Sequence, residues 1–420
     1  MARETWARHA AHEAAVFGLP AVLIYRQMHA QAIDASAPGF VGFNRFAHGR
    51  NLAGPGYEAF KTPNADTLYS NAYLDLTGGP VLLEVSATNG RYFTANFLDM
   101  FGNATNISAR THGTSGGRFL IATTDWGGEV PDGTTLFRVT QPYMWILLRI
   151  EAEDDRALPV ARALQDRFAI RSQGQTGTRR AFPRPGSLAD VTSLLTVLDW
   201  VVENAGVRNS ERALVHRFRG LGVGGPLSVA EALDDPRTLA GARQGLADAA
   251  MVIDRVKRQK SADAGGWRET FDPGRYGHNY LFRSGIHSLG TGANVRLENF
   301  SFTTFSDAEG QVLDGSRHEY VLRFESPPPS EFFWSVTVYD LRTQELVPNA
   351  QGKYLVGSNT EGLKIASDGS VTIRLSRRAE GPNAIPVPEG PFYLALRAQG
   401  PRRELLDGSW RPSPVRKEQR

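Results

Sequence analysis

Residues 62–70 read Thr-Pro-Asn-Ala-Asp-Thr-Leu-Tyr-Ser, a polar turn that runs directly into a strand-like segment. Pro63 fixes its own backbone and disfavours helix at the residue before it, while Asn64 and Asp66 can bond neighbouring amides and hold the turn. The strand-like run that follows ends at a Gly-Gly-Pro sequence. The stretch therefore predicts the start of a β-rich domain. Its Asp66 and Tyr69 either face a ligand or belong to a self-satisfied corner of the fold.

Short β-rich runs continue on both sides of this turn, separated by Gly, Asn and Pro. In the first half of the chain the runs cover residues 69–76, 81–85, 92–99, 118–123, 135–139 and 144–150. Several short strands at this spacing favour a sandwich or barrel over a sheet of alternating strands and helices. A similar set returns later, at residues 318–324, 332–339, 371–375 and 392–397.

Helical spacing of apolar residues marks the start and the middle of the chain. It extends over residues 4–32, 158–170, 188–204, 228–234 and 239–260. The fold class predicted is mainly β with a helical segment (α+β). We expect an N-terminal helical segment at 1–35, a first β-rich domain at 36–157, a helical bridge or insertion at 158–275, and a second β-rich domain at 276–420.

The composition excludes several classes of protein. The chain has 420 residues with 22% charged and 10% aromatic side chains, so general disorder is disfavoured. It has no cysteine, which excludes disulfides and thiolate chemistry. The net charge of +3 is too small to predict nucleic-acid binding. No apolar run is long enough for a membrane span and no secretory signal is evident, so we expect a cytoplasmic protein.

Particular motifs give a resemblance that covers nearly the whole chain. They are Phe43-Asn44-Arg45-Phe46, Pro63 to Ser70, Gly79-Pro80-Val81, Arg91-Tyr92 with Asp99, Phe333 to Asp340, Pro391-Phe392-Tyr393-Leu394 and Leu406 to Trp410. Together they resemble the paired family of the domain of unknown function twelve fifty-four (N-terminal) and the domain of unknown function twelve fourteen (C-terminal). The resemblance implies two β-sandwich or jelly-roll-like domains joined by helices, often as a homo-oligomer, and implies no established reaction.

The chain departs from the pattern of that family at two places. Asn383 is followed by Ala384, Ile385 and Pro386, where relatives usually carry Asn-Trp before a Leu-Pro pair. The run 298–302, Glu-Asn-Phe-Ser-Phe, lacks the tyrosine that the resemblance implies. If these positions line a pocket, its ligand differs from that of the relatives.

Polar side chains on neighbouring loops and strand starts are the candidate site residues. Asp66, Tyr69 and His112 are the predicted catalytic groups, since a buried carboxylate beside a phenol can exchange protons when its pKa is shifted. The predicted substrate-binding residues are Asn64, Arg91, Tyr92, Asp99 and Arg110. For each group a structural role is the alternative: Asp66 capping its own turn, Arg91 pairing with a strand carboxylate, His112 lying on the surface.

Metal and cofactor signals are weak. His9 and His12 have a spacing that can share one metal, but no third ligand follows nearby and no zincin motif occurs. No phosphate loop or nucleophile elbow is present, so we predict no metal, no nucleotide cofactor and no serine nucleophile.

The leading hypothesis is an enzyme that acts on a small, largely apolar organic substrate in the first β-domain. It would use acid/base chemistry of the hydrolase, lyase or isomerase type without a cofactor. The rivals are a non-catalytic small-ligand carrier or oligomeric scaffold, and a metal-dependent cupin-like enzyme.

Overall fold

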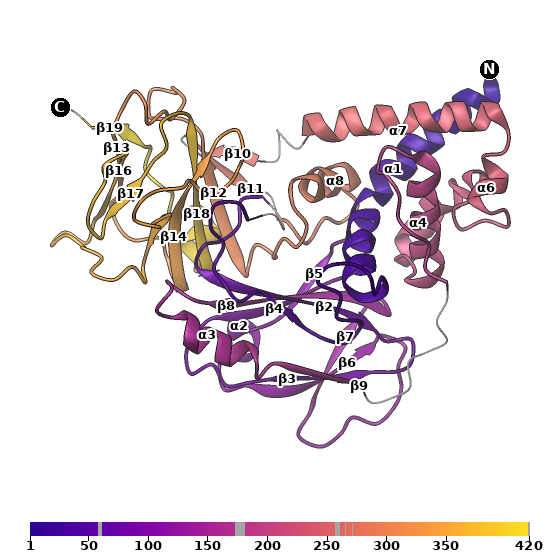
Figure 1. Ribbon diagram of the computed structural model, residues 1–420, viewed down its shortest axis with the longest axis horizontal. Helices are drawn as coiled ribbons and strands as arrows, with labels where there is room; N and C mark the ends of the chain where they lie inside the picture. The colour runs from indigo at the N-terminus through magenta and orange to yellow at the C-terminus, as the bar shows by residue number, and fades with distance from the viewer. Residues whose placement is uncertain (58–60, 173–180, 257–260, 265, 271, 419–420) are drawn as a thin grey trace.

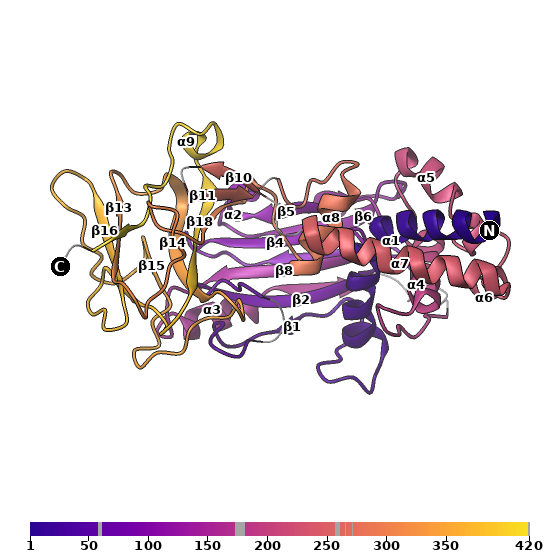
Figure 2. The ribbon, with the colours of Figure 1, turned by 90° about the horizontal axis from the view of Figure 1, so that it is seen from above.

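The computed structural model describes the chain except for residues 58–60, 173–180, 257–260, 265, 271 and 419–420. The N-terminal β domain lies at the bottom of Figure 1, the C-terminal β domain at the left, and a layer of helices at the upper right. The two ends of the chain lie at opposite ends of the molecule (Figures 1 and 2). Two β-rich regions with helices between them confirm the predicted α+β fold class.

The N-terminal domain consists of two stacked sheets. The first sheet has the order β1 (Ala47–His48), β2 (Thr67–Asp75), β8 (Tyr143–Glu151), β4 (Phe93–Leu98) and β5 (Ala104–Ser108). The second has the order β7 (Thr135–Val139), β6 (Gly117–Thr123), β3 (Val81–Val85) and β9 (Ala169–Ser172). Alternate residues such as Leu68, Ile150 and Leu83 form the core between the sheets, because successive side chains of a strand point to opposite faces. Two short helices flank these sheets, α2 (Ala109–His112) and α3 (Leu158–Gln165).

The C-terminal domain is also a two-sheet sandwich. Its larger sheet has the order β10 (Ser261–Ala264), β11 (Trp267–Thr270), β12 (Asn299–Thr304), β18 (Phe392–Pro401), β14 (Ser330–Asp340) and β15 (Leu355–Gly357). The smaller has the order β17 (Ala384–Pro386), β16 (Val371–Ser376), β13 (Tyr320–Phe324) and β19 (Arg416–Lys417). Phe302, Val336 and Leu394 of the larger sheet pack on Leu322 and Ile373 of the smaller one. The other face of the larger sheet is thus left for the N-terminal domain.

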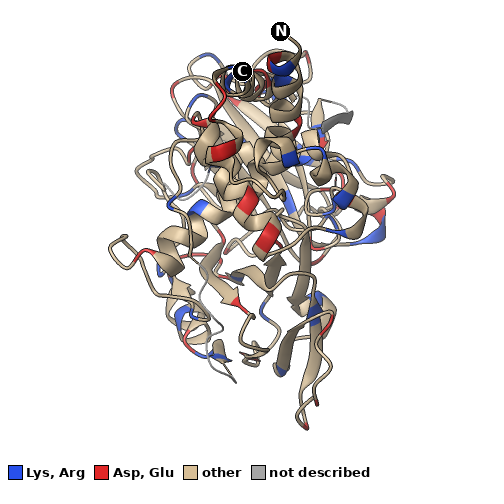
Figure 3. Ribbon diagram, turned by 90° about the vertical axis from the view of Figure 1, so that its right-hand side faces the viewer, with Lys and Arg blue, Asp and Glu red and all other residues tan. Residues whose placement is uncertain are grey.

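The helical layer is built around α1 (Ala2–Met28), which lies against the other long helices (Figure 1). Gly241 and Gly245 permit this packing, since an added Cβ would lie 2.1 Å from the carbonyl oxygens of Glu4 and Arg8 respectively. The other segments of the layer are η1 (His29–Ile33), α4 (Val191–Asn204), η2 (Asn209–Glu211), α5 (Arg212–His216), η3 (Arg219–Leu221), α6 (Val229–Ala232), α7 (Pro236–Val256) and α8 (Tyr280–Leu289), while α9 (Arg403–Leu406) belongs to the C-terminal domain. Charged residues of both signs are scattered along the ribbon at this end of the molecule (Figure 3).

Three strands come from the region that we expected to be a helical bridge. β9 pairs with β3 of the first domain, and β10 and β11 extend the larger C-terminal sheet. The predicted helix 239–260 is α7, and its residues 257–260 lie outside the described part of the chain. The domain boundaries stay a prediction. Among the helices that the structure describes, none combines the length and apolar character that a membrane span requires.

Candidate functional site

A polar row crosses the first sheet near the C-terminal domain. Tyr69 of β2 lies opposite Arg149 of β8, which lies opposite Thr94 of β4, which lies opposite Ser108 of β5. Figure 2 shows these four strands side by side. The residues one position along point to the other face and are apolar core, as Leu68, Ile150, Phe93 and Ile107 show. One face of the sheet is therefore polar where it meets the C-terminal domain.

The larger C-terminal sheet presents a second polar row. Ser301 of β12 pairs with Arg397 of β18, which pairs with Ser335 of β14. These side chains alternate with the apolar residues that form the C-terminal core, so they point away from that core. Two polar rows from separate domains thus face the junction between them.

A cavity of about 240 Å³ lies at this junction. The N-terminal domain contributes Lys61, Thr62, Asn64, Tyr69 and Arg149, and the C-terminal domain contributes Asn299, Ser301, Thr303, Phe305, Gln344, Tyr393, Ala395 and Arg397. The connecting segment completes the wall with Pro273, Ile286 and residues 289–294. The cavity therefore depends on both domains.

Arg149 is the central cation of the first wall. Its Nη2 donates to the carbonyl oxygen of Gly292 at 2.6 Å, and its guanidinium lies 5.6 Å from the centroid of the Tyr69 ring. Its Nη1 is buried and has no hydrogen-bond partner among the described residues. The Arg149 guanidinium thus retains an N–H group that can donate a further hydrogen bond.

Arg397 is the cation of the opposite wall. It donates to the Tyr339 hydroxyl at 2.8 Å and to the carbonyl oxygen of Thr62 at 2.9 Å. The Tyr339 hydroxyl in turn donates to the carbonyl oxygen of Pro63 at 2.6 Å, and the hydroxyls of Tyr393 and Thr62 are 2.7 Å apart. The C-terminal domain thus holds the polar turn at 62–64 in place.

Asp66 lies beside the cavity rather than in its wall. It is 5% exposed; its Oδ2 accepts from the Ser335 hydroxyl at 2.6 Å, and its Oδ1 has no partner among the described residues. Burial raises the pKa of this carboxyl, while the Ser335 hydrogen bond and the nearby Arg397 oppose the rise. Asp66 is thus joined to the polar row of the C-terminal domain through Ser335.

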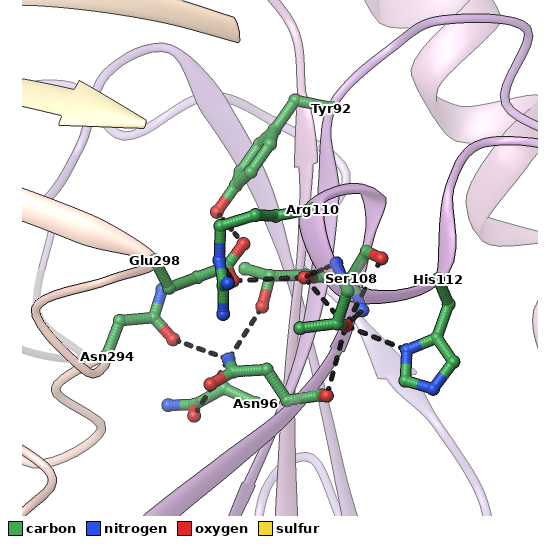
Figure 4. Close-up of polar contacts among 10 residues, drawn as sticks. Tyr92, Asn96, Ser108, Arg110, His112, Asn294 and Glu298 are labelled. Carbon is green, nitrogen blue, oxygen red and sulfur yellow. Dashed lines mark hydrogen bonds and ion pairs between the residues drawn. The ribbon is translucent and has the colours of Figure 1, made fainter. Parts of the chain in front are cut away.

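A second polar cluster surrounds Glu298, which immediately precedes β12 (Figure 4). Its Oε1 accepts from Tyr92 at 2.9 Å, and its Oε2 accepts from Ser108 and from Arg110, each at 3.0 Å. Glu298 is fully buried, and burial raises the pKa of its carboxyl. The cluster reaches the cavity through Asn294, whose side-chain oxygen accepts from Asn106 at 3.1 Å.

The predicted site residues divide into groups. Asn64 and Tyr69 line the cavity, and the Tyr69 hydroxyl accepts a hydrogen bond from the backbone N–H of Asn64 at 3.1 Å. Tyr92 and Arg110 bind Glu298. His112 is exposed beside this cluster, with its Nδ1 2.7 Å from the Thr111 hydroxyl (Figure 4).

The two remaining predicted residues lie away from the cavity. Arg91 forms an ion pair with Glu153 at 2.8 Å. Asp99 accepts hydrogen bonds from the amides of Phe101 and Asn103, each at 2.9 Å, and from the Asn103 side chain at 2.8 Å. Both residues thus tie local backbone in place.

Sequence reasoning missed Arg149, Arg397 and Tyr393. Arg149 is flanked by Leu148 and Ile150, and Arg397 by Leu396 and Ala398, so each is the one cation of its central strand and has apolar neighbours. Such a residue is buried only with partners, which is the signal that could have found them.

No group of three or more His, Asp or Glu side chains in the described part of the chain is arranged to hold a metal ion.

These features define a two-domain, β-rich protein with a polar cavity at the junction of its β-sandwiches. Residues 43–172 match the model described as Protein of unknown function (DUF1254), and residues 298–403 match Protein of unknown function (DUF1214). The two matches lie in the N-terminal and C-terminal parts of the chain respectively, which confirms the predicted resemblance.

One solved structure supports the same overall fold. The VPA0106 protein from Vibrio parahaemolyticus is 27% identical, with a TM-score of 0.76 over 98% of this chain and 100% of that chain. An uncharacterized protein from Burkholderia cenocepacia is 12% identical, with a TM-score of 0.47 over 96% of this chain and 87% of that one. No curated protein matches the sequence.

Proposed function

We propose that the protein binds a small organic molecule in the cavity between its two β-domains. The observation that carries this proposal is the meeting of the two polar rows, Tyr69 with Arg149 and Ser301 with Arg397, on opposite walls of one cavity. Small-molecule sites commonly lie at domain interfaces and combine apolar walls with a few converging polar groups. Ile286, a neutral apolar residue, is part of this wall.

Acid/base conversion of the bound molecule is the second candidate function. It is favoured by the Tyr69 phenol, which lines the cavity and is held by the Asn64 amide. In this scheme Tyr69 exchanges a proton with the substrate, and Asn64 orients the substrate. Asp66 is a positioning residue that acts through Arg397. The largely apolar substrate first expected gives way here to a more polar one, because cationic and amide side chains share the wall. The cytoplasmic location and the homo-oligomeric state stay predictions.

A blocking variant tests the proposal. Ser301 points into the cavity from β12, so Ser301→Trp would fill it, whereas Thr372→Trp places the same side chain at an exposed position of β16. Native mass spectrometry of the purified proteins would identify small molecules that stay bound. We expect a retained molecule in the wild type and in Thr372→Trp but not in Ser301→Trp. Equal retention in both variants would contradict the proposal.

Tyr69→Phe separates binding from conversion once a bound molecule is known. If Tyr69 exchanges a proton, the variant keeps affinity for that molecule and loses turnover. If the protein is a carrier, neither the wild type nor the variant changes the molecule. The readout is product formation beside an affinity measurement on the same preparations.

A further inference from the structure

We infer that the molecule bound between the domains carries an oxyanion, a carboxylate or a phosphate, which Arg149 and Arg397 bind together from the two sides. This inference rests on the proposed function and narrows it to a class of ligand. It depends on the charges of the cavity wall and on the hydrogen bonds that its two arginines make.

The charge of the wall has one sign. Its ionisable groups include Lys61, Arg149 and Arg397, and no Asp or Glu is among the described residues that line it. Lys61 is exposed and forms an ion pair with Glu345, so its charge is already balanced. Arg149 and Arg397 are the cations that remain.

Neither arginine has a carboxylate partner within ion-pair distance among the described residues. Arg149 donates to a backbone carbonyl, and Arg397 donates to a phenol and a backbone carbonyl. All of these acceptors are neutral. Asp66 is a carboxylate that influences Arg397, and burial raises the pKa of Asp66, which favours its neutral form. A cation held away from water costs free energy unless an anion compensates it, and a bound oxyanion would supply that compensation.

The placement of Arg149 and Arg397 on the cavity wall suits one anionic group that is bound by both guanidinium groups. Arg149 retains a buried Nη1 without a partner, and a guanidinium presents parallel N–H groups that match carboxylate and phosphate oxygens. The Arg149 guanidinium lies 5.6 Å from the centroid of the Tyr69 ring, and Tyr69, Arg149 and Arg397 all line the cavity.

The rest of the wall sets the size and polarity of the ligand body. A cavity of about 240 Å³ is somewhat smaller than the roughly 300–1,000 Å³ that is usual for ligand sites, so the ligand body is small. Asn299, Ser301 and Thr303 offer neutral hydrogen-bonding groups along β12, and Ile286 and Leu289 add apolar side chains to the wall. The ligand class is a small organic acid or organic phosphate with a mixed polar and apolar body.

Matched probes that differ only in charge test the inference. Thermal stability and titration calorimetry would be measured with benzoate, benzamide and inorganic phosphate on the wild type, Arg149→Gln, Arg149→Lys and Arg397→Gln. Arg342→Gln, at an exposed position, controls for the change in net charge. We expect binding of benzoate or phosphate but not benzamide, weakened about tenfold or more in Arg149→Gln and in Arg397→Gln and unchanged in Arg342→Gln. Arg149→Lys keeps the charge but loses the planar guanidinium, so its affinity for the anion should lie between those of the wild type and Arg149→Gln.

The outcomes separate the inference from the function on which it rests. Binding of benzoate alone identifies a carboxylate head, and binding of phosphate as well identifies a general oxyanion site; both support the inference. Anion binding that is equal in all variants would reveal an adventitious ion only and overturn it. Binding of benzamide but not of the anions, blocked by Ser301→Trp, would overturn the inference and leave the proposed function standing. No binding of any probe, with a neutral molecule retained by the wild type, would overturn it in the same way.

Discussion

The hydroxyl of Tyr92 donates to Oε1 of Glu298 at 2.9 Å, with both side chains fully buried. This bond joins the segment that leads into β4 of the N-terminal domain to the residue that precedes β12 of the C-terminal domain. The same carboxylate accepts from Ser108 and Arg110, so three residues of the first domain converge on one residue of the second.

Tyr92→Phe should lower the stability of the whole molecule. The variant removes one donor from a buried carboxylate and leaves that oxygen unsatisfied, which costs about 1–3 kcal/mol of the free energy of unfolding. Urea denaturation would measure the loss. Tyr354→Phe, at a half-buried position, is the matched control and should change stability little. Equal effects of the two variants would refute the role of the Tyr92 hydroxyl.

His287 should make the fold sensitive to acid. Burial, followed by the nearby Arg283, lowers the pKa of His287 to about 3, and neither ring nitrogen has a hydrogen-bond partner among the described residues. The unfolded chain binds a proton near the ordinary pKa of 6.5 and the folded protein does not. Stability from this group is therefore complete above pH 6.5 and is lost as the pH falls toward 3.

The expected size of that loss is about 2 kcal/mol between about pH 7.5 and pH 5, at about 1.4 kcal/mol per pH unit below the unfolded pKa. His287→Leu should reduce the acid sensitivity, as thermal melts at the two pH values would measure. His216→Gln alters an exposed histidine and should leave the wild-type pH dependence in place. A His287→Leu protein with the same pH dependence as the wild type would show that this side chain is not responsible.

Gly245→Ala should destabilise the helical layer. In an ordinary helix this change is favourable by up to about 1 kcal/mol. Here the added Cβ would lie 2.1 Å from the carbonyl oxygen of Arg8, so the helices must separate, at a cost of about 1–3 kcal/mol. Gly127→Ala, where the added atom meets nothing within 4 Å, is the control for thermal melting. A melting temperature that rises in Gly245→Ala would mean that α1 and α7 do not pack this closely.

The strands could be predicted from the sequence wherever apolar residues alternate, as β14 and β18 show. The short strands β9, β10 and β11 could not. β9 pairs with the distant strand β3, and the short pair β10–β11 joins the larger C-terminal sheet through β12. The polar turn at Asp66 and Tyr69 was identified as the place to look. The two arginines of the cavity were not identified. Arg149 and Arg397 line one cavity only when the two domains pack, and no local sequence pattern encodes that packing.

A crystal structure of the protein with benzoate is the most direct test of the central claim, an anion site between the two domains. We expect the carboxylate in the cavity, with its oxygens at about 2.7–3.2 Å from guanidinium nitrogens of Arg149 and Arg397. Benzoate bound elsewhere, or bound in the cavity with its carboxylate turned away from both arginines, would contradict it.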